Sequence, residues 1–345
     1  MTRRTVLVCV SILGLLVAGL LTTACPEGDG EGGDSAKKVK SIAELPGPVR
    51  STLAQFAPAQ AKPEDLEREE ENGVVTWSAE YEMDKGDLEV TALSDGTLVS
   101  IERERRPSAL PREVVDASEE VLGTRPKEAD HVRLAVYEIE DSPEAGTIRE
   151  RFVDPFGQVV LQRVHKAGPE HDTPETLSDL PDVVRVTLET ETGGAKLTGL
   201  QMENEWGQTI HAASWNAADG PREVKILENG HVLYLELPTG PLPARVAAMI
   251  KKGAGYPEAA TETNEEQAEE ATAESSSEGE QELAEEGGSE EAEGHAGHAA
   301  SSAGVERLLL DAWEVRGKRD GRELEVLVLP TGEVVRTDSE AKAAD

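Results

Sequence analysis

The segment LPGPVRSTL, residues 45–53, decides the fold because its pattern returns three more times along the chain. It reads LPREVVDAS at 110–118, LPDVVRVTL at 180–188 and LPARVAAMI at 242–250. Proline suits the first turn of a helix, where its missing N–H is not needed. The apolar residues that follow recur every four positions, with Ser118 as the polar exception. Each Leu-Pro pair therefore predicts the start of an amphipathic helix.

Strands are predicted after each helix, and two landmarks recur in them. The first is one aromatic residue per copy, at Tyr81, Tyr137, Trp215 and Trp313. The second is a turn glycine, at Gly96, Gly157, Gly230 and Gly332; two of these belong to Asp-Gly and Asn-Gly pairs, which are typical of tight hairpins. We interpret the aromatic residues as core anchors in preference to a row of ligand-stacking rings.

These landmarks predict an α+β fold of four tandem repeats, each with one helix followed by three to four antiparallel strands. A unit of about 60 residues buries little surface alone, so we expect the repeats to pair as two modules. The predicted boundaries are 41–105 for repeat 1, 106–165 for repeat 2, 166–178 for a linker, 179–237 for repeat 3 and 238–340 for repeat 4.

An acidic insertion interrupts repeat 4 at about 258–303. Residues 258–293 contain 15 Glu and no Lys or Arg, a composition that predicts disorder. Two interpretations stay open: a solvated spacer, or a loop that attracts cations or a basic partner. His295 and His298 are weak metal candidates only, because two histidines without a fixed scaffold make a poor site.

The N-terminus has the pattern of an export signal. Arg3 and Arg4 precede an apolar stretch that ends in small residues before Cys25. This resembles the lipobox of bacterial lipoproteins, although Thr22 stands where that family usually has Leu. The resemblance implies a signal peptide over 1–24, a lipidated Cys25 that anchors the chain to the envelope membrane, and a flexible tether over 25–40. An ordinary secretory signal or an uncleaved anchor is the alternative.

Charge and residue types exclude several function classes. The formal net charge of −35 argues against binding nucleic acid, because phosphates would be repelled. Cys9 and Cys25 are the two cysteines, so the body of the chain has no thiol for a disulfide, a metal or a nucleophile. No nucleophile with its base, phosphate-binding glycine loop or zinc spacing appears. We therefore expect no catalytic residues and no cofactor.

The order of helix, aromatic strand, Asp-Gly turn and further strand resembles PepSY-like domains, a group that includes repeats similar to a bacterial β-lactamase inhibitor protein. Residues 45–101 and 180–235 carry this resemblance most clearly. It implies an exported, envelope-anchored module that binds or inhibits a protein or peptide, with no shared catalytic residues. The alternatives are a structural spacer lipoprotein with a cation-attracting loop and, remotely, a hydrolase.

Overall fold

The computed structural model describes residues 37–58, 61–71, 73–166, 173–238, 240–253 and 305–339. The helices are α1 (Gly47–Phe56), α2 (Arg112–Leu122), α3 (Asp182–Thr192) and α4 (Ala244–Gly253), with short 3-10 turns at Ile42–Glu44 and Pro107–Ala109. The strands of the first half are β1 (Lys37–Lys38), β2 (Asp65–Glu71), β3 (Val74–Tyr81), β4 (Leu88–Leu93), β5 (Leu98–Arg105), β6 (Glu128–Asp141), β7 (Thr147–Val153) and β8 (Val159–Lys166). Those of the second half are β9 (Thr173–Pro174), β10 (Leu197–Glu205), β11 (Gln208–Ala217), β12 (Gly220–Leu227), β13 (Val232–Leu237), β14 (Val305–Arg319), β15 (Arg322–Val328) and β16 (Val334–Ser339).

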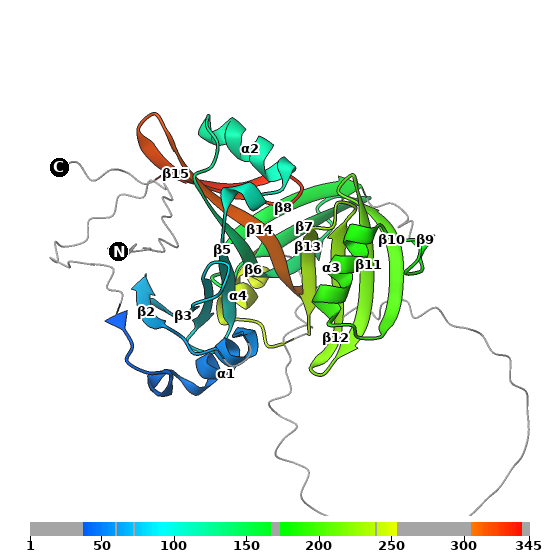
Figure 1. The fold of residues 1–345 in the computed structure, drawn as a ribbon. Coiled ribbons are helices and arrows are strands. Elements are labelled where there is room, and N and C mark those ends of the chain that lie inside the picture. The colour runs from blue at the N-terminus through cyan, green and yellow to red at the C-terminus, as the bar shows by residue number, and fades with distance from the viewer. Residues whose placement is uncertain are drawn as a thin grey trace, which may run out of the picture.

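All sixteen of these strands belong to one antiparallel sheet (Figure 1). Twelve follow one another in the order β1-β2-β3-β4-β5-β6-β14-β13-β12-β11-β10-β9. The β7–β8 hairpin branches from β6, and the β15–β16 hairpin branches from β14. The prediction of an α+β fold made of four tandem repeats, paired as two modules, is therefore wrong: the described chain is built on a continuous β-sheet.

Two long central strands, β6 and β14, explain why the strands form one sheet. β6 has 14 residues and β14 has 15, and they pair with each other from Val305↔Ile139 to Arg316↔Glu128. Each is long enough to pair with one further strand along its first part and another along its last part. The strands that would form the edges of two separate modules are therefore hydrogen-bonded to each other, and no free edge remains between β6 and β14.

The helices do not all pack on the strands that follow them. A Cβ at Gly96 would lie 2.7 Å from Pro48 of α1, and one at Gly230 would lie 3.0 Å from Val183 of α3, so these two helices cover hairpins among the strands that follow them, β4–β5 and β12–β13. In contrast, Gly332 lies against Glu113 of α2, and Gly157 lies against Arg245 of α4. Helices α2 and α4 are thus exchanged between the two hairpins that branch from the central strands.

Gly96 shows why glycine is required at these turns. Its φ is +87°, and its N–H donates to the Leu93 carbonyl over 2.8 Å to close the hairpin. The backbone of α1 covers the Cα directly, so any side chain would collide with Pro48. Only glycine combines the left-handed backbone with this close approach.

The four helices lie on one face of the central strands. Odd-numbered residues of β6 and β14, such as Ala135, Tyr137, Leu309 and Trp313, pack with the helices. Even-numbered residues point to the opposite face, because side chains alternate along a strand. There, Val136, Leu308 and Leu310 join a second core to which the described helices contribute no residue.

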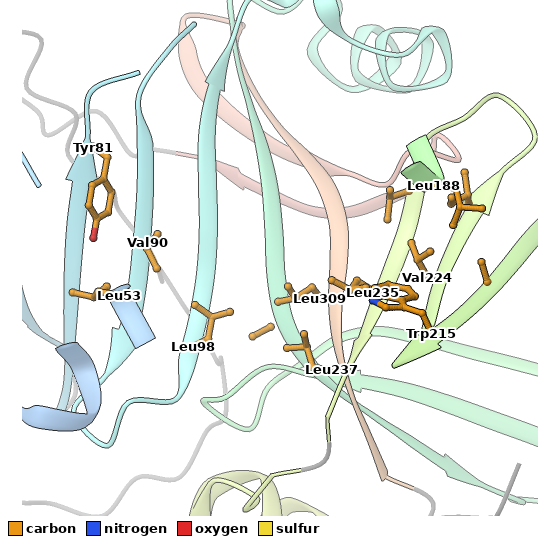
Figure 2. Close-up of a cluster of buried hydrophobic side chains, with 14 of the residues drawn as sticks. Leu53, Tyr81, Val90, Leu98, Leu188, Trp215, Val224, Leu235, Leu237 and Leu309 are labelled. Atoms are coloured by element: carbon orange, nitrogen blue, oxygen red, sulfur yellow. The ribbon is translucent and has the colours of Figure 1, made fainter. Parts of the chain in front are cut away.

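The largest core runs under α1 and α3 and is continuous between them (Figure 2). Leu53 of α1 packs with Tyr81, Val90 and Leu98, and Leu188 of α3 packs in the same cluster. Figure 2 shows Leu309 of β14 and Leu235 and Leu237 of β13 lying between these two groups. Apolar burial therefore joins the two halves of the chain, in agreement with the single sheet.

None of the helices in the described part of the chain has the length and apolar character needed to cross a membrane.

Candidate functional site: an acidic groove on the face opposite α1

A groove with a volume of about 1380 Å³ lies on the N-terminal half of the sheet. Its floor consists of β2, β3, β4 and β5, the start of β6 and the end of β14. Eleven acidic and seven basic residues line it. The acidic residues are Asp65, Glu67, Glu69, Glu80, Asp84, Asp87, Glu89, Glu102, Glu104, Glu128 and Asp130. The basic residues are Lys38, Lys85, Arg103, Arg105, Arg106, Lys127 and Arg316.

Strand alternation produces the acidic floor. Ala79 and Val90 point toward α1 and are fully buried in the core. The adjacent positions Glu80, Glu89 and Glu102 point to the opposite face. Sheet register then places Glu80 opposite Glu89, and Glu89 opposite Glu102. Three carboxyl groups consequently lie side by side on neighbouring strands, an arrangement that disfavours ionisation of all three.

The central strands extend this row of carboxyl groups. Asp130 of β6 lies opposite Glu314 of β14. Arg316 is the cation between them: its guanidinium lies 3.3 Å from Asp130 and 3.2 Å from Glu325, and it also pairs with Glu314. Burial disfavours the charged Arg316, but these three carboxylates outweigh burial and raise its pKa. One guanidinium therefore serves three acidic side chains.

Burial, more than mutual repulsion, shifts the ionisation of the floor. It raises the pKa of Glu89 to about 8, with a further contribution from Glu102. Burial likewise raises the pKa of Glu314, which lies opposite Asp130 and outside the groove lining, to about 8, with Glu325 and Glu102 adding to the effect. The pKa of Glu102 is raised by burial although Ser100 Oγ donates a hydrogen bond to its carboxylate over 2.9 Å. At neutral pH the floor thus holds protons that a cationic ligand can replace.

The raised pKa of Glu89 predicts that stability falls as pH rises. The folded protein keeps this proton up to about pH 8, whereas an unfolded glutamate loses it near 4.5. Between these values the folded state binds more protons, so the free energy of unfolding decreases with increasing pH. We expect Glu89→Gln to flatten this decrease between pH 5 and pH 8, measured by urea unfolding at several pH values. Parallel curves for the variant and the wild type would contradict the assignment.

The residues singled out from the sequence lie elsewhere. Tyr81, Tyr137, Trp215 and Trp313 are all buried in the cores beneath the helices, so none of them lines the groove. The turn glycines Gly96, Gly157, Gly230 and Gly332 have φ between +84° and +87° and lie against helix residues. Cys25, His295 and His298, and the acidic insertion as a whole, lie outside the described residues.

Sequence reasoning missed the floor of the groove. Glu80, Glu89 and Glu102 belong to three strands, and Asp130 belongs to a fourth. The sequence has 69 Asp and Glu, so single carboxylates carried no signal. A usable signal was alternation along the strands: Glu80, Glu89 and Glu102 are each next to an apolar residue that faces the core.

No protein-family model and no curated protein matches the chain. Two solved structures of DUF2874 family proteins are similar to part of it. The protein from Bacteroides uniformis is 16% identical, with 35% of this chain and 89% of that chain covered and a TM-score of 0.22. The protein from Bacteroides ovatus is 18% identical, with 35% and 87% covered and a TM-score of 0.21. Neither similarity extends to the whole sheet.

Proposed function

We propose that this protein is an exported, lipid-anchored binding protein without catalytic activity, and that its acidic groove binds a basic peptide segment. The observation that carries the proposal is the row of half-buried carboxyl groups at Glu80, Glu89 and Glu102 on the floor of the groove, continued by Asp130. Like charges opposite one another in a sheet are destabilising. Proteins keep such arrangements mainly at functional sites. An ammonium or guanidinium group in the groove would relieve this repulsion.

The dimensions favour a peptide over a small cation. The groove of about 1380 Å³ is larger than most small-molecule pockets, which hold roughly 300–1,000 Å³. Its floor extends from β2 to β6, a width of about 19 Å at the usual strand spacing. An extended segment of about six residues spans that width. Alternate Lys or Arg side chains of such a segment would point toward the carboxyl groups.

Anchoring and export rest on the N-terminal pattern that ends at Cys25. A lipid on Cys25 would hold the folded part near a membrane, where peptide segments of envelope proteins are available as ligands. The PepSY-like resemblance supports the same class of function, since it implies binding or inhibition. Mass measurement of Cys25 in the membrane fraction tests the anchor independently of the groove.

The binding proposal is tested with a labelled peptide, Lys-Thr-Lys-Thr-Lys-Thr, and fluorescence anisotropy on the mature chain. We expect binding that weakens with added salt and that is lost when Gln replaces Lys in the peptide. The double variant Glu89→Gln/Glu102→Gln should bind at least about tenfold more weakly, because hydrogen bonds to charged groups contribute about 1.5–3 kcal/mol each.

A matched control separates the groove from the net charge of the protein. Glu120 of α2 and Glu189 of α3 are exposed on the helical face, so Glu120→Gln/Glu189→Gln also replaces two carboxyl groups by amides, but away from the groove. This variant should bind the peptide within about twofold of the wild type, because distant exposed charges are screened. Equal losses in both double variants, or full binding by the groove variant, would overturn the proposal.

A further inference from the structure

The outer end of the carboxyl row in the groove holds a cation that belongs to the chain itself. Asp65 of β2 lies opposite Glu80, the first carboxyl group of the row. The Lys38 ammonium of β1 forms an ion pair with Asp65 Oδ2. Lys38 lines the groove together with Asp65 and Glu80. A lysine of the protein therefore lies where the row begins, on the surface to which a basic peptide would bind.

Strand pairing gives the Lys38 side chain its direction. β1 runs antiparallel to β2, and Lys38 lies directly opposite Glu67, which also lines the groove. The next residue, Val39, packs against the core under α1, and its N–H donates to the Leu66 carbonyl over 2.8 Å. Because side chains alternate along a strand, Lys37 points to the same side as Val39, away from the groove. The backbone thus directs Lys38, and not Lys37, toward the carboxyl row.

Asp65 is oriented by its own backbone. Its Oδ1 accepts a hydrogen bond from the Leu66 N–H over 2.9 Å, and its Oδ2 is the oxygen that contacts Lys38. The pKa of Lys38 is raised, first by the hydrogen bond to Asp65 and the charge of Asp65, and then by the charges of Glu67 and Glu80. The ammonium therefore interacts with the acidic floor beyond its direct partner.

The contact between Lys38 and Asp65 is open enough for a ligand to replace it. The Lys38 side chain is 73% exposed and that of Asp65 is 29% exposed. Ion pairs near the surface contribute little to stability, because solvent screens them and a long side chain loses freedom when it is held. β1 itself has only two residues. Lys38 can consequently leave Asp65 without disturbing the sheet.

We propose that Lys38 is an internal ligand of the groove, which occupies Asp65 in the free protein and is displaced by a lysine of the bound peptide. This inference rests on the proposed function, because it assigns a regulatory contact to the same site. The lysine of β1 inhibits the groove partially: a basic peptide must compete with it for the outer end of the row. Removing the Lys38 ammonium should therefore strengthen peptide binding.

Two single variants of the same segment test the proposal, with the labelled peptide Lys-Thr-Lys-Thr-Lys-Thr and fluorescence anisotropy on the mature chain. Lys38→Gln frees Asp65, so we expect it to bind the peptide about twofold to fivefold more tightly than the wild type, the gain that matches a surface ion pair. Lys37→Gln removes the same charge one residue away, on the opposite face. It should bind the peptide like the wild type.

A second background separates the ion pair from a general effect of charge. In Asp65→Asn the partner of Lys38 is gone, so adding Lys38→Gln should change the affinity no more than adding Lys37→Gln does. Equal affinities of Lys38→Gln and Lys37→Gln, or a gain from Lys38→Gln that persists in Asp65→Asn, would overturn the internal ligand alone. Failure of the wild type and of every variant to bind the peptide would overturn the proposed function together with this inference.

Discussion

Replacing Leu122 by alanine is expected to lower the free energy of unfolding by about 2–5 kcal/mol, the usual range for a buried leucine. Leu122 ends α2, is 1% exposed and packs with Trp313, Val315 and Val326. A Cβ on Gly317 of β14 would lie 2.9 Å from its Cδ1, so the leucine covers that glycine directly. Urea unfolding monitored by circular dichroism measures the effect.

A double-mutant cycle shows whether α2 belongs to the β14–β15 strands. Leu122→Ala combined with Val326→Ala of β15 should give a coupling energy of about 0.5–3 kcal/mol, because the two side chains share one cluster. Leu122→Ala combined with Val153→Ala of β7 should be additive, because Val153 packs with Val246 of α4. Coupling to Val153 in place of Val326 would mean that the helices are not exchanged.

Asp311→Ala is expected to cost about 3–5 kcal/mol, since it removes the buried carboxylate of an ion-pair network and leaves the half-buried Arg133 without its main partner. The Asp311 carboxylate accepts hydrogen bonds from Arg133 Nε over 2.9 Å and pairs with His131 Nε2 over 2.8 Å. Burial opposes its ionisation, but Arg133 and His131 outweigh burial and lower its pKa. Arg133 also reaches Glu191 of α3 over 2.6 Å, so the network joins β6, β14 and α3.

The control for this prediction is an ion pair near the surface. Arg336 lies 2.6 Å from Asp338, and both side chains are about two-fifths exposed. Asp338→Ala should therefore cost less than about 1 kcal/mol. Thermal unfolding of both variants at one pH gives the comparison. Equal losses for Asp311→Ala and Asp338→Ala would contradict the idea that the buried network stabilises the contact between the central strands.

Local features could be predicted from the sequence. Each Leu-Pro pair precedes a helix, and the apolar stripe points inward: Val49, Val114, Val184 and Val246 are all fully buried. The aromatic landmarks lie in the cores, and the turn glycines adopt the left-handed backbone. These properties depend on residues close together in the chain, where spacing and turn chemistry act directly.

The fold class could not be predicted in the same way. Whether strands form separate sheets or one sheet depends on pairing between residues far apart, such as Leu134 with Leu310. The exchange of α2 and α4 could not be predicted from nearby residues, because both helices present similar apolar stripes to similar hairpins.

Ser118, the polar residue in the apolar stripe of α2, is buried like the apolar residues at the equivalent positions. Its hydroxyl donates a hydrogen bond to the Val115 carbonyl over 3.0 Å, so burial leaves it with a partner.

The groove depends on the same missing information. Glu89 meets Glu102 only after the register of neighbouring strands is set. An acidic sequence offers many such carboxyl pairs, and burial distinguishes the few whose ionisation is shifted.

The central claim is that the carboxyl groups of the groove receive the cations of a ligand in place of protons. Isothermal titration calorimetry at pH 7, repeated in buffers with different ionisation enthalpies, measures the protons that move on binding. Because the pKa of Glu89 is about 8 in the free protein and must fall beside a cation, Lys-Thr-Lys-Thr-Lys-Thr should release protons as it binds. Heats that are identical in all buffers, with the peptide bound, would contradict the account.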